Sequence, residues 1–340
     1  MRIPDGQHLP FDPFDGKAFR LRIGARPLDP LAWIVLDERT DDELDQKVAL
    51  LTASPEQFGV CVTLPKDPLS IAAAEELHAA VAAHLRTYEP AHWQSATERI
   101  EQFEKGDAIT SVGSQTPGTE HRGAVRQPDL TGAEPNSRAE NLPRTKLGHP
   151  LVHAGLLTQE DWCILVQQSP EEPLLLTAGT LCFPNRWRLS DKIGLPMLGV
   201  HTPVPQYGEE VGAPTNSLLK RLTPDRPVWR MNWGIADIAA LHQPTGHFDP
   251  NAGSRVLDIG ADVVLRIERQ TLIRLPTTGA VVFGIRTIVR TLNEVLSSDP
   301  TVATRMATAV ETLPEDMRAY KSLTKLGPLV SSWLRAQGSN

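Results

Sequence analysis

Two long runs of apolar and β-branched residues constrain the fold of this chain more than any other feature. They cover residues 263–273 and 280–289, and the segment between them ends in Leu-Pro-Thr-Thr-Gly, residues 275–279. β-Branched residues favour strands, and a short Gly-containing loop between two such runs is typical of an antiparallel hairpin. A third run, at 174–183, ends at a Pro-Asn turn and predicts another strand. We therefore expect an antiparallel sheet.

Helical patterning flanks these predicted strands. In segment 67–86, Asp67 can cap a helix, Pro68 fits its first turn, and apolar residues recur every four positions from Leu69 to Leu85. The C-terminal part of the chain is also helical in pattern, with a start at Asp299 and a break at Pro314. Helices beside an antiparallel sheet predict the α+β class.

The composition changes between residues 105 and 148, where Gly, Ser, Thr, Pro, Asn and charged residues dominate. Such a segment buries too little apolar surface to offset its ordering entropy. We interpret 105–148 as a flexible linker or insertion between an N-terminal helical part, 1–104, and a core, 149–340. The alternative is a partner-contacting loop that orders on assembly.

Charge and hydrophobicity exclude some classes of protein. The net charge of −7 over 340 residues argues against nonspecific binding to nucleic acid or anionic membranes. No window approaches the ~20 apolar residues that span a bilayer, and the N-terminus lacks the basic and apolar regions of a signal peptide. A cytoplasmic location is the expectation.

One histidine stands out as a candidate metal ligand. His201 lies between an apolar run and the stiff Pro203-Val204-Pro205 turn, within a segment rich in Trp, Arg and Lys. Prolines fix φ and leave the segment few conformations, and imidazole is a common metal ligand. Cys182 is a rival as a thiolate ligand, although a Cys in a strand is most often a small buried hydrophobe.

The other cysteines and histidines give weaker signals. Cys61, Cys163 and Cys182 are far apart and form no C-x-x-C pair, so no disulfide framework, zinc site or iron–sulfur site is readable. His242 and His247 either line the site or lie on an exposed loop, and the loop is favoured. His78 and His84 are interpreted as surface or boundary residues, since six positions separate them.

A charged run interrupts the first predicted strand of the hairpin. Arg266 and Glu268 alternate with Ile267 and therefore share a face. If that face meets a pocket, Glu268 attracts a cation and Arg266 sets its ionisation. The alternative, which we slightly favour, is a structural Arg–Glu cluster. Trp187 and Trp233 likewise either contact a bound group or belong to the core.

Several separated blocks together resemble one known family. They are FDPFDG (11–16), LLTQEDWCIL (156–165), FPNRWRLSDKIGLPMLGVHTPVP (183–205), RMNWGIAD (230–237) and LRIERQTLIRLPTTGAVVFGIRTI (265–288). In this order they resemble the alpha subunit of the haem-dependent oxidative N-demethylases, bacterial enzymes that demethylate dimethylamine. The resemblance covers most of the chain outside the linker. Its blocks are specific for the family, and not for one substrate.

The resemblance implies a fold and a site. The fold would be a PAS-like antiparallel sheet flanked by helices, with additional N- and C-terminal helices, and it would hold b-type haem on one face of the sheet. His201 would be the iron ligand. The haem contacts would come from Lys192, Arg230, Trp233 and Arg286. The three basic residues would pair with the haem propionates. Glu268 and Arg266 would be the catalytic pair.

The resemblance also implies an activity and partners. The chain would oxidatively N-demethylate a small methylated amine such as dimethylamine, using O₂ and releasing formaldehyde. Electrons would come from NADPH through partner subunits that carry FMN and a 2Fe-2S centre, in a hetero-oligomer. A second hypothesis is a non-catalytic, haem-binding PAS-like sensor or carrier. A third is a structural subunit that has lost its cofactor.

Overall fold

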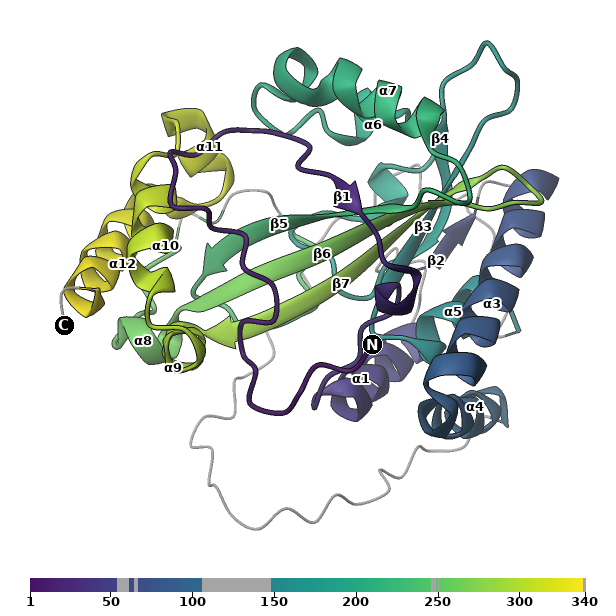
Figure 1. Ribbon diagram of the computed structural model, residues 1–340, viewed down its shortest axis with the longest axis horizontal. Helices are drawn as coiled ribbons and strands as arrows, with labels where there is room; N and C mark the ends of the chain where they lie inside the picture. The colour runs from purple at the N-terminus through teal and green to yellow at the C-terminus, as the bar shows by residue number, and fades with distance from the viewer. Residues whose placement is uncertain (54–60, 64–66, 106–147, 246–248, 250, 339–340) are drawn as a thin grey trace.

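The computed structural model describes residues 1–53, 61–63, 67–105, 148–245, 249 and 251–338 (Figure 1). Nearly all of the predicted linker at 105–148 lies outside these residues, as does His247. The described part contains both strands and helices, and the α+β prediction is confirmed. Among the described residues, no helix is long and apolar enough to cross a membrane.

One antiparallel sheet runs through the described part of the chain, with strand order β1-β5-β6-β7-β3-β4-β2. The strands are β1 (Arg26–Pro27), β2 (Cys61–Thr63), β3 (Asp161–Val166), β4 (Leu175–Thr180), β5 (Val228–Ala236), β6 (Val264–Arg274) and β7 (Val281–Thr291). Strands from the start of the chain form both edges, because β1 pairs with β5 and β2 pairs with β4. Segments distant in sequence therefore share one sheet.

The predicted hairpin is confirmed and forms the centre of the sheet. β6 and β7 pair without a break from Val264 opposite Thr291 to Arg274 opposite Val281. The connecting loop closes with a bond from the Leu275 amide to the Ala280 carbonyl, 2.8 Å long. Glycine suits position 279 because φ is +70° there, in the left-handed region.

Helices from the first half of the chain cover one face of the sheet (Figure 1). They are α1 (Thr40–Thr52), α3 (Pro68–Tyr88), α4 (Pro90–Lys105) and α5 (Pro150–Leu157). The predicted helix at 67–86 is confirmed as α3, since the Asp67 carboxylate accepts a bond from the Leu69 amide and Pro68 is the first helical residue. Its buried residues include Leu77, Val81 and Leu85, which pack against Trp162 and Ile164 of β3 in one apolar cluster.

The C-terminal helices pack beside one end of β5 and β6 (Figure 1). They are α8 (Ile259–Asp262), α9 (Leu292–Ser298), α10 (Val302–Glu311), α11 (Glu315–Tyr320) and α12 (Leu323–Gln337). The predicted boundaries are close, because Asp299 accepts from the Thr301 amide just before α10 and Pro314 precedes α11. α10 and α12 bury Met306, Val310 and Leu326 against one another.

The opposite face of the sheet is covered less densely. α6 (Met197–Val200), a π-helical turn (Gly208–Gly212) and α7 (Ala213–Arg221) lie above it, and the N-terminal segment passes over the same side on its way to β1 (Figure 1). We call residues 13–24 the N-terminal strap. Between these elements and the sheet lies a cavity.

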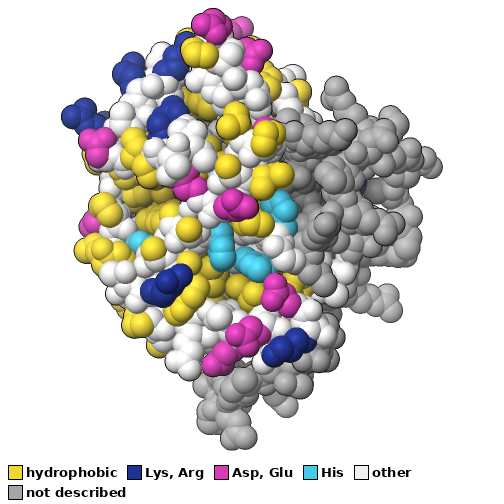
Figure 2. Space-filling model, turned by 90° about the vertical axis from the view of Figure 1, so that its right-hand side faces the viewer, with side chains coloured by type: hydrophobic (Ala, Val, Ile, Leu, Met, Phe, Trp, Pro, Cys, Tyr) yellow, Lys and Arg dark blue, Asp and Glu magenta, His cyan; other side chains and the backbone are white. Residues whose placement is uncertain are grey.

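Histidine side chains gather on the face shown in Figure 2. The rings of His78 on α3 and His153 on α5 lie 5.5 Å apart, and His153 Nε2 is 3.0 Å from the Glu104 carboxylate. Within the described ranges, no group of three or more His, Cys, Asp or Glu side chains has an arrangement that would hold a metal ion.

Candidate functional site

The cavity has a volume of about 730 Å³, within the usual ~300–1,000 Å³ of cofactor and ligand pockets. Its floor is one face of the sheet, where cross-strand neighbours point the same way. The register aligns Arg230, Gln270 and Ile285 on this face, and Asn232 with Glu268. The lining from this face comprises Cys163, Leu165, Leu176, Arg230, Asn232, Glu268, Gln270, Leu272, Phe283 and Ile285, and β1 and β5 add Arg26, Trp229, Met231 and Trp233 at the edge of the sheet.

His201 lines this cavity directly after α6. Its Nδ1 lies 2.9 Å from the Met197 carbonyl oxygen. Because a carbonyl only accepts, Nδ1 carries the proton and Nε2 keeps a lone pair for a ligand. Burial lowers the pKa of His201 to about 4, with a further contribution from Arg230 and Lys192. The imidazole is therefore neutral at physiological pH, as a metal ligand must be.

Tyr207 was not identified from the sequence, yet it contacts His201 directly. The two rings are stacked, with centroids 4.2 Å apart and planes 5° from parallel. The π-helical turn that follows Tyr207 adds a residue to the helical repeat, and such turns are frequent at functional sites. No residue spacing in the sequence predicts this stacking, because the position of the Tyr207 ring depends on the conformation of the π-helical turn.

Two of the predicted basic residues line the cavity. Lys192 donates from Nζ to the Val200 carbonyl at 2.7 Å, one residue before His201. Arg230 lies on β5, and its Nε is buried with no hydrogen-bond partner in the described part of the protein. Burial lowers the pKa of both side chains. An unpaired buried guanidinium N–H is costly, and an anionic ligand would satisfy it.

Glu268 lies on the cavity floor and is only 8% exposed. Its Oε2 accepts two hydrogen bonds, from Gln270 Nε2 at 2.9 Å and from Asn232 Nδ2 at 3.3 Å. Two amide donors hold the carboxylate in one orientation. The predicted shared face of Arg266 and Glu268 follows the strand alternation, but the two residues have different surroundings.

Arg266 and Arg286 do not line the cavity. The Arg266 guanidinium donates to the carbonyls of Phe183 and Ala240, at 2.6 and 3.3 Å, and is 2% exposed. Arg286 follows Ile285 by one residue and so points to the opposite face. There it is fully buried and pairs with Asp37 at 2.8 Å and Glu43 at 2.9 Å. Both arginines therefore bind groups of the protein itself outside the cavity.

The aromatic candidates Trp187 and Trp233 both line the cavity. Trp233 is 9% exposed and packs against Phe14 of the N-terminal strap, with ring centroids 5.1 Å apart. Lys321, which follows α11, lies over the Trp233 ring with Nζ 4.9 Å from the centroid. Lys321 also lines the cavity and was not identified from the sequence, where it is one of several lysines in a helical region.

The cysteine and histidine alternatives lie elsewhere. Cys182 is fully buried in the cluster beneath α3 and α5, and its carbonyl oxygen is 2.7 Å from His242 Nδ1. Cys163 on β3, and not Cys182, contributes to the cavity wall. Burial raises the pKa of the Cys163 thiol, so it is protonated. A thiolate ligand is thus disfavoured at Cys163.

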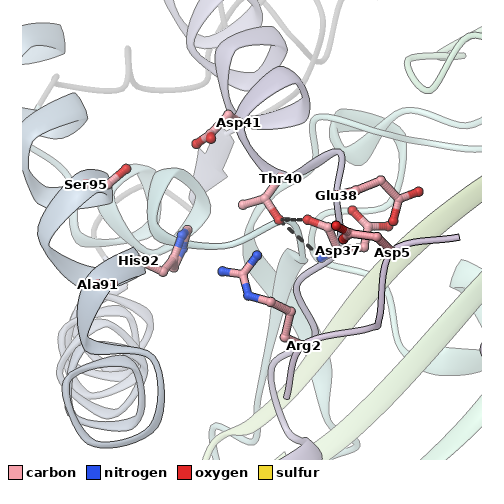
Figure 3. Close-up of a pocket in the computed structure, with 9 residues that line it drawn as sticks. All are labelled: Arg2, Asp5, Asp37, Glu38, Thr40, Asp41, Ala91, His92 and Ser95. Carbon is pink, nitrogen blue, oxygen red and sulfur yellow. Dashed lines mark hydrogen bonds between the residues drawn. The ribbon is translucent and has the colours of Figure 1, made fainter. Parts of the chain in front are cut away.

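A second pocket, of about 430 Å³, lies between the first residues of the chain, α1 and α4 (Figure 3). Its lining consists of Arg2, Asp5, Asp37, Glu38, Thr40, Asp41, Ala91, His92 and Ser95. The Asp37 amide donates to the Thr40 hydroxyl, which in turn donates to the Asp37 carbonyl. This pocket is polar, and none of the predicted site residues lines it.

Comparison with known families identifies the family of the chain. A family model described as "Haem-dependent oxidative N-demethylase, alpha subunit-like" matches residues 24–331, which is most of the chain. The match contains every element that lines the cavity except the N-terminal strap. The description names a haem-dependent oxidoreductase and one subunit of an assembly. The chain belongs to the haem-dependent oxidative N-demethylase alpha subunit-like family.

Proposed function

We propose that the cavity holds b-type haem with His201 as the iron ligand, and that the chain oxidatively N-demethylates a small methylated amine. The single observation that carries this proposal is the state of His201. Its imidazole is neutral, its Nδ1 is engaged by a backbone carbonyl, and it faces a cavity of cofactor size. Histidines that ligate metals typically donate their other ring N–H in this way.

The remaining residues of the cavity fit the same group. Arg230, with its unpartnered Nε, and Lys192 would pair with the propionates, since charge-assisted bonds to carboxylates are strong. Phe283, Ile285 and Leu272 offer an apolar floor for a porphyrin. Trp233 would contact its edge. We further propose that the sheet and the elements above this floor form a PAS-like haem domain.

Haem would supply oxygen binding and electron transfer, and the protein would supply orientation and polarity. Glu268 would accept a hydrogen bond from the amine nitrogen and so direct the N-methyl group. Asn232 and Gln270 hold that carboxylate. The strap residue Phe14 packs against Trp233 and would exclude water at one wall. Arg266 would act through the neighbouring backbone and not on the substrate.

The overall reaction requires an external source of electrons. A methylated amine, dioxygen, an electron pair and two protons would give the demethylated amine, formaldehyde and water, which balances atoms and charge. We propose that an NADPH-dependent reductase with FMN and a 2Fe-2S centre delivers the electrons as a partner subunit in the cytoplasm. The proposed substrates are small methylated amines such as dimethylamine.

Reconstitution tests this function. The haem-loaded chain with its reductase should release formaldehyde in proportion to NADPH when dimethylamine is present, and should not oxidise NADPH alone. Glu268→Gln should lower this rate at least tenfold while haem content stays the same, because removing a group that orients substrate costs about 10²-fold. Glu171→Gln on the exposed surface is the matched control. Haem reduction without formaldehyde from any small methylamine would favour a sensor instead.

A further inference from the structure

Two charged side chains inside the cavity are held by neutral groups only. The Glu268 carboxylate is 8% exposed and accepts hydrogen bonds from the side-chain amides of Asn232 and Gln270. The partly buried Lys321 ammonium donates to the Trp233 carbonyl, 2.7 Å away. Within the described ranges, neither charged group forms an ion pair. Because a charge removed from water is costly unless it is paired, each of these groups favours a ligand of the opposite charge.

Adjacent residues of β5 hold the carboxylate and the ammonium group. The Asn232 side chain donates to Glu268 Oε2 at 3.3 Å, and the carbonyl of the next residue, Trp233, accepts from Lys321. Lys321 Nζ also lies 4.9 Å from the centroid of the Trp233 ring. Glu268 and Lys321 both line the cavity. Since they are near one another and yet form no ion pair, one small ligand in the cavity can contact both.

The backbone beside Lys321 is fixed by side-chain contacts. Ser322 has φ of +58°, in the left-handed region that residues other than glycine seldom adopt. Its hydroxyl accepts from the Asp249 amide at 3.0 Å and from the Arg186 guanidinium. Lys321 therefore enters the cavity from a backbone position that is already ordered, which lowers the entropy cost of binding a ligand there.

The other cations of the lining differ from Lys321 in exposure or in their proposed partner. Lys192 and Arg230 are the proposed partners of the haem propionates. Four more cations line the cavity from the N-terminal strap and β1, and all are exposed: Lys17, Arg20, Arg22 and Arg26. Arg22 pairs with Asp15 at 2.7 Å. Water and salt screen exposed charges, so Lys321 is the interior cation that remains for a ligand.

The lining as a whole carries an excess of positive charge. In the described part of the chain, seven lysine and arginine side chains line the cavity, against the carboxylates of Asp15 and Glu268. The two propionates of a haem would reduce this excess and not remove it. A simple ammonium ion therefore enters against a positive field, whereas a ligand that also carries a carboxylate has no net charge.

We propose that the cavity binds a methylated amine that also carries a carboxylate, with its ammonium group at Glu268 and its carboxylate at Lys321. This inference rests on the proposed function for the methylated nitrogen, and it narrows the substrates to N-methylated amino acids. Such a zwitterion pairs both interior charges and leaves the net charge of the cavity unchanged. The rings of Phe14 and Phe19, which contact Trp233, offer a surface for the N-methyl groups.

A matched set of ligands tests this proposal by binding alone. N,N-dimethylglycine, N,N-dimethyl-β-alanine and 4-(dimethylamino)butyrate carry a dimethylammonium group and a carboxylate at increasing separation, and dimethylammonium lacks the carboxylate. Calorimetric titration of the haem-loaded full chain at pH 7 measures each affinity. Burial lowers the pKa of Lys321 to about 8, so the side chain keeps its proton at this pH. At least one zwitterion should bind about tenfold to hundredfold more tightly than dimethylammonium, since hydrogen bonds between charged groups are strong.

Variants assign the two ends of the ligand to their partners. Lys321→Met should lower the affinity for the best zwitterion about tenfold or more and should not lower the affinity for dimethylammonium, because only the carboxylate loses its partner. Lys321→Arg keeps the charge and should retain the preference for the zwitterion. Glu268→Gln should weaken both ligands about tenfold. Lys220→Met, on the exposed surface of α7, is the control and should bind as the unsubstituted protein does.

Two results would overturn the proposal. One is that no zwitterion binds the unsubstituted protein more tightly than dimethylammonium does, a result that needs no folded variant. The other is that Lys17→Met or Arg20→Met, and not Lys321→Met, removes the preference, which would place the carboxylate at the strap. Circular dichroism and haem content establish that each variant is folded.

The binding test and the activity test have separate outcomes, because binding is measured without reductase or turnover. Formaldehyde release from dimethylamine, with no preference for a zwitterion, would contradict this inference and leave the proposed function in place. Tight binding of a zwitterion through Lys321, with no formaldehyde released from any methylated amine, would contradict the proposed function and leave the binding site in place.

Discussion

The imidazole of His201 lies parallel to the phenol ring of Tyr207, with 5° between the planes and 4.2 Å between the centroids. The stacking keeps the imidazole ring from tilting away from the plane of the phenol ring. The Met197 carbonyl fixes which imidazole nitrogen carries the proton. Together these contacts hold Nε2 in one direction before any ligand binds. Such preorganisation avoids the entropy cost of ordering a ligand side chain on binding.

Removal of the Tyr207 ring should therefore weaken the cofactor site. Tyr207→Leu is expected to lower haem affinity about threefold to tenfold, since aromatic stacking contributes about 0.5–1.5 kcal/mol. Tyr207→Phe keeps the stacked ring and should retain most of the affinity. Haem transfer to an acceptor protein measures both values. Equal affinity in all three proteins would show that the stacking does not orient His201.

His201→Gly should abolish the Soret band of a bound b-type haem while the far-ultraviolet circular dichroism stays unchanged. The reason is that the proposed iron ligand is lost, whereas the fold depends on other clusters. Added imidazole should restore much of the band by filling the space left. If Cys163→Ala or Cys182→Ala removes the band instead, the ligand is a thiolate.

Arg286→Met should destabilise the fold by about 3–5 kcal/mol, because Asp37 and Glu43 would remain buried without their partner. Urea denaturation measures the loss. Arg226→Met is the control, since its pair with Asp225 is mostly exposed and should contribute little. Haem content per folded Arg286→Met molecule should not change. A selective loss of haem would show that Arg286 contacts the propionates, as expected from the sequence.

Gly284→Ala should cost about 1–3 kcal/mol, as overpacking of a tight core does. A Cβ at this position of β7 would come within 2.6 Å of both the Trp162 ring and the Thr271 hydroxyl. Gly148→Ala, where the nearest atom would be 3.9 Å away, should be nearly neutral. Thermal denaturation of the two variants compares them. A neutral Gly284→Ala would mean that Trp162 can shift.

His84 should make the stability of the protein depend on pH. Burial lowers its pKa to about 4, and its Nε2 has no hydrogen-bond partner among the described residues. The unfolded state binds a proton at a pKa near ~6.5, before the folded state does. Stability is therefore complete above that pH and is lost as pH falls from there toward about 4.

The variant His84→Phe should lack this dependence, since it keeps a ring between Trp33 and Tyr88 without a titrating group. Its free energy of unfolding relative to the unsubstituted protein should improve by about 1 kcal/mol between pH 7 and pH 4.5. Urea denaturation at the two pH values measures this change. A constant difference would show that His84 titrates normally in the folded protein.

Local patterns in the sequence predicted some of the regular elements. The β6–β7 hairpin follows from β-branched runs around a Gly-containing loop, and α3 follows from Asp67, Pro68 and a four-residue apolar repeat. These signals depend only on residues close together along the chain, so they can be read from the sequence. Alternation along β6 also predicted that Arg266 and Glu268 share a face.

Alternation could not say how far each side chain lies from the cavity. Arg266 and Glu268 share a face, but only Glu268 lines the cavity, because Arg266 is bound to the Phe183 and Ala240 carbonyls. Arg286 pairs with carboxylates from the loop before α1 and from α1 itself, more than 240 positions away. Which charges meet depends on which helices cover each face of the sheet.

The sequence by itself determined the family, the β6–β7 hairpin, α3 and the helical C-terminal part, and it offered His201 as the candidate ligand, because each depends on residue type and short spacing. Only the tertiary structure decided that Tyr207 stacks on His201 and that Lys321 and Trp233 form one wall with the strap. These contacts join segments that no periodicity links. They arise because burial of the apolar faces of the sheet and the C-terminal helices brings β5, α11 and the strap together.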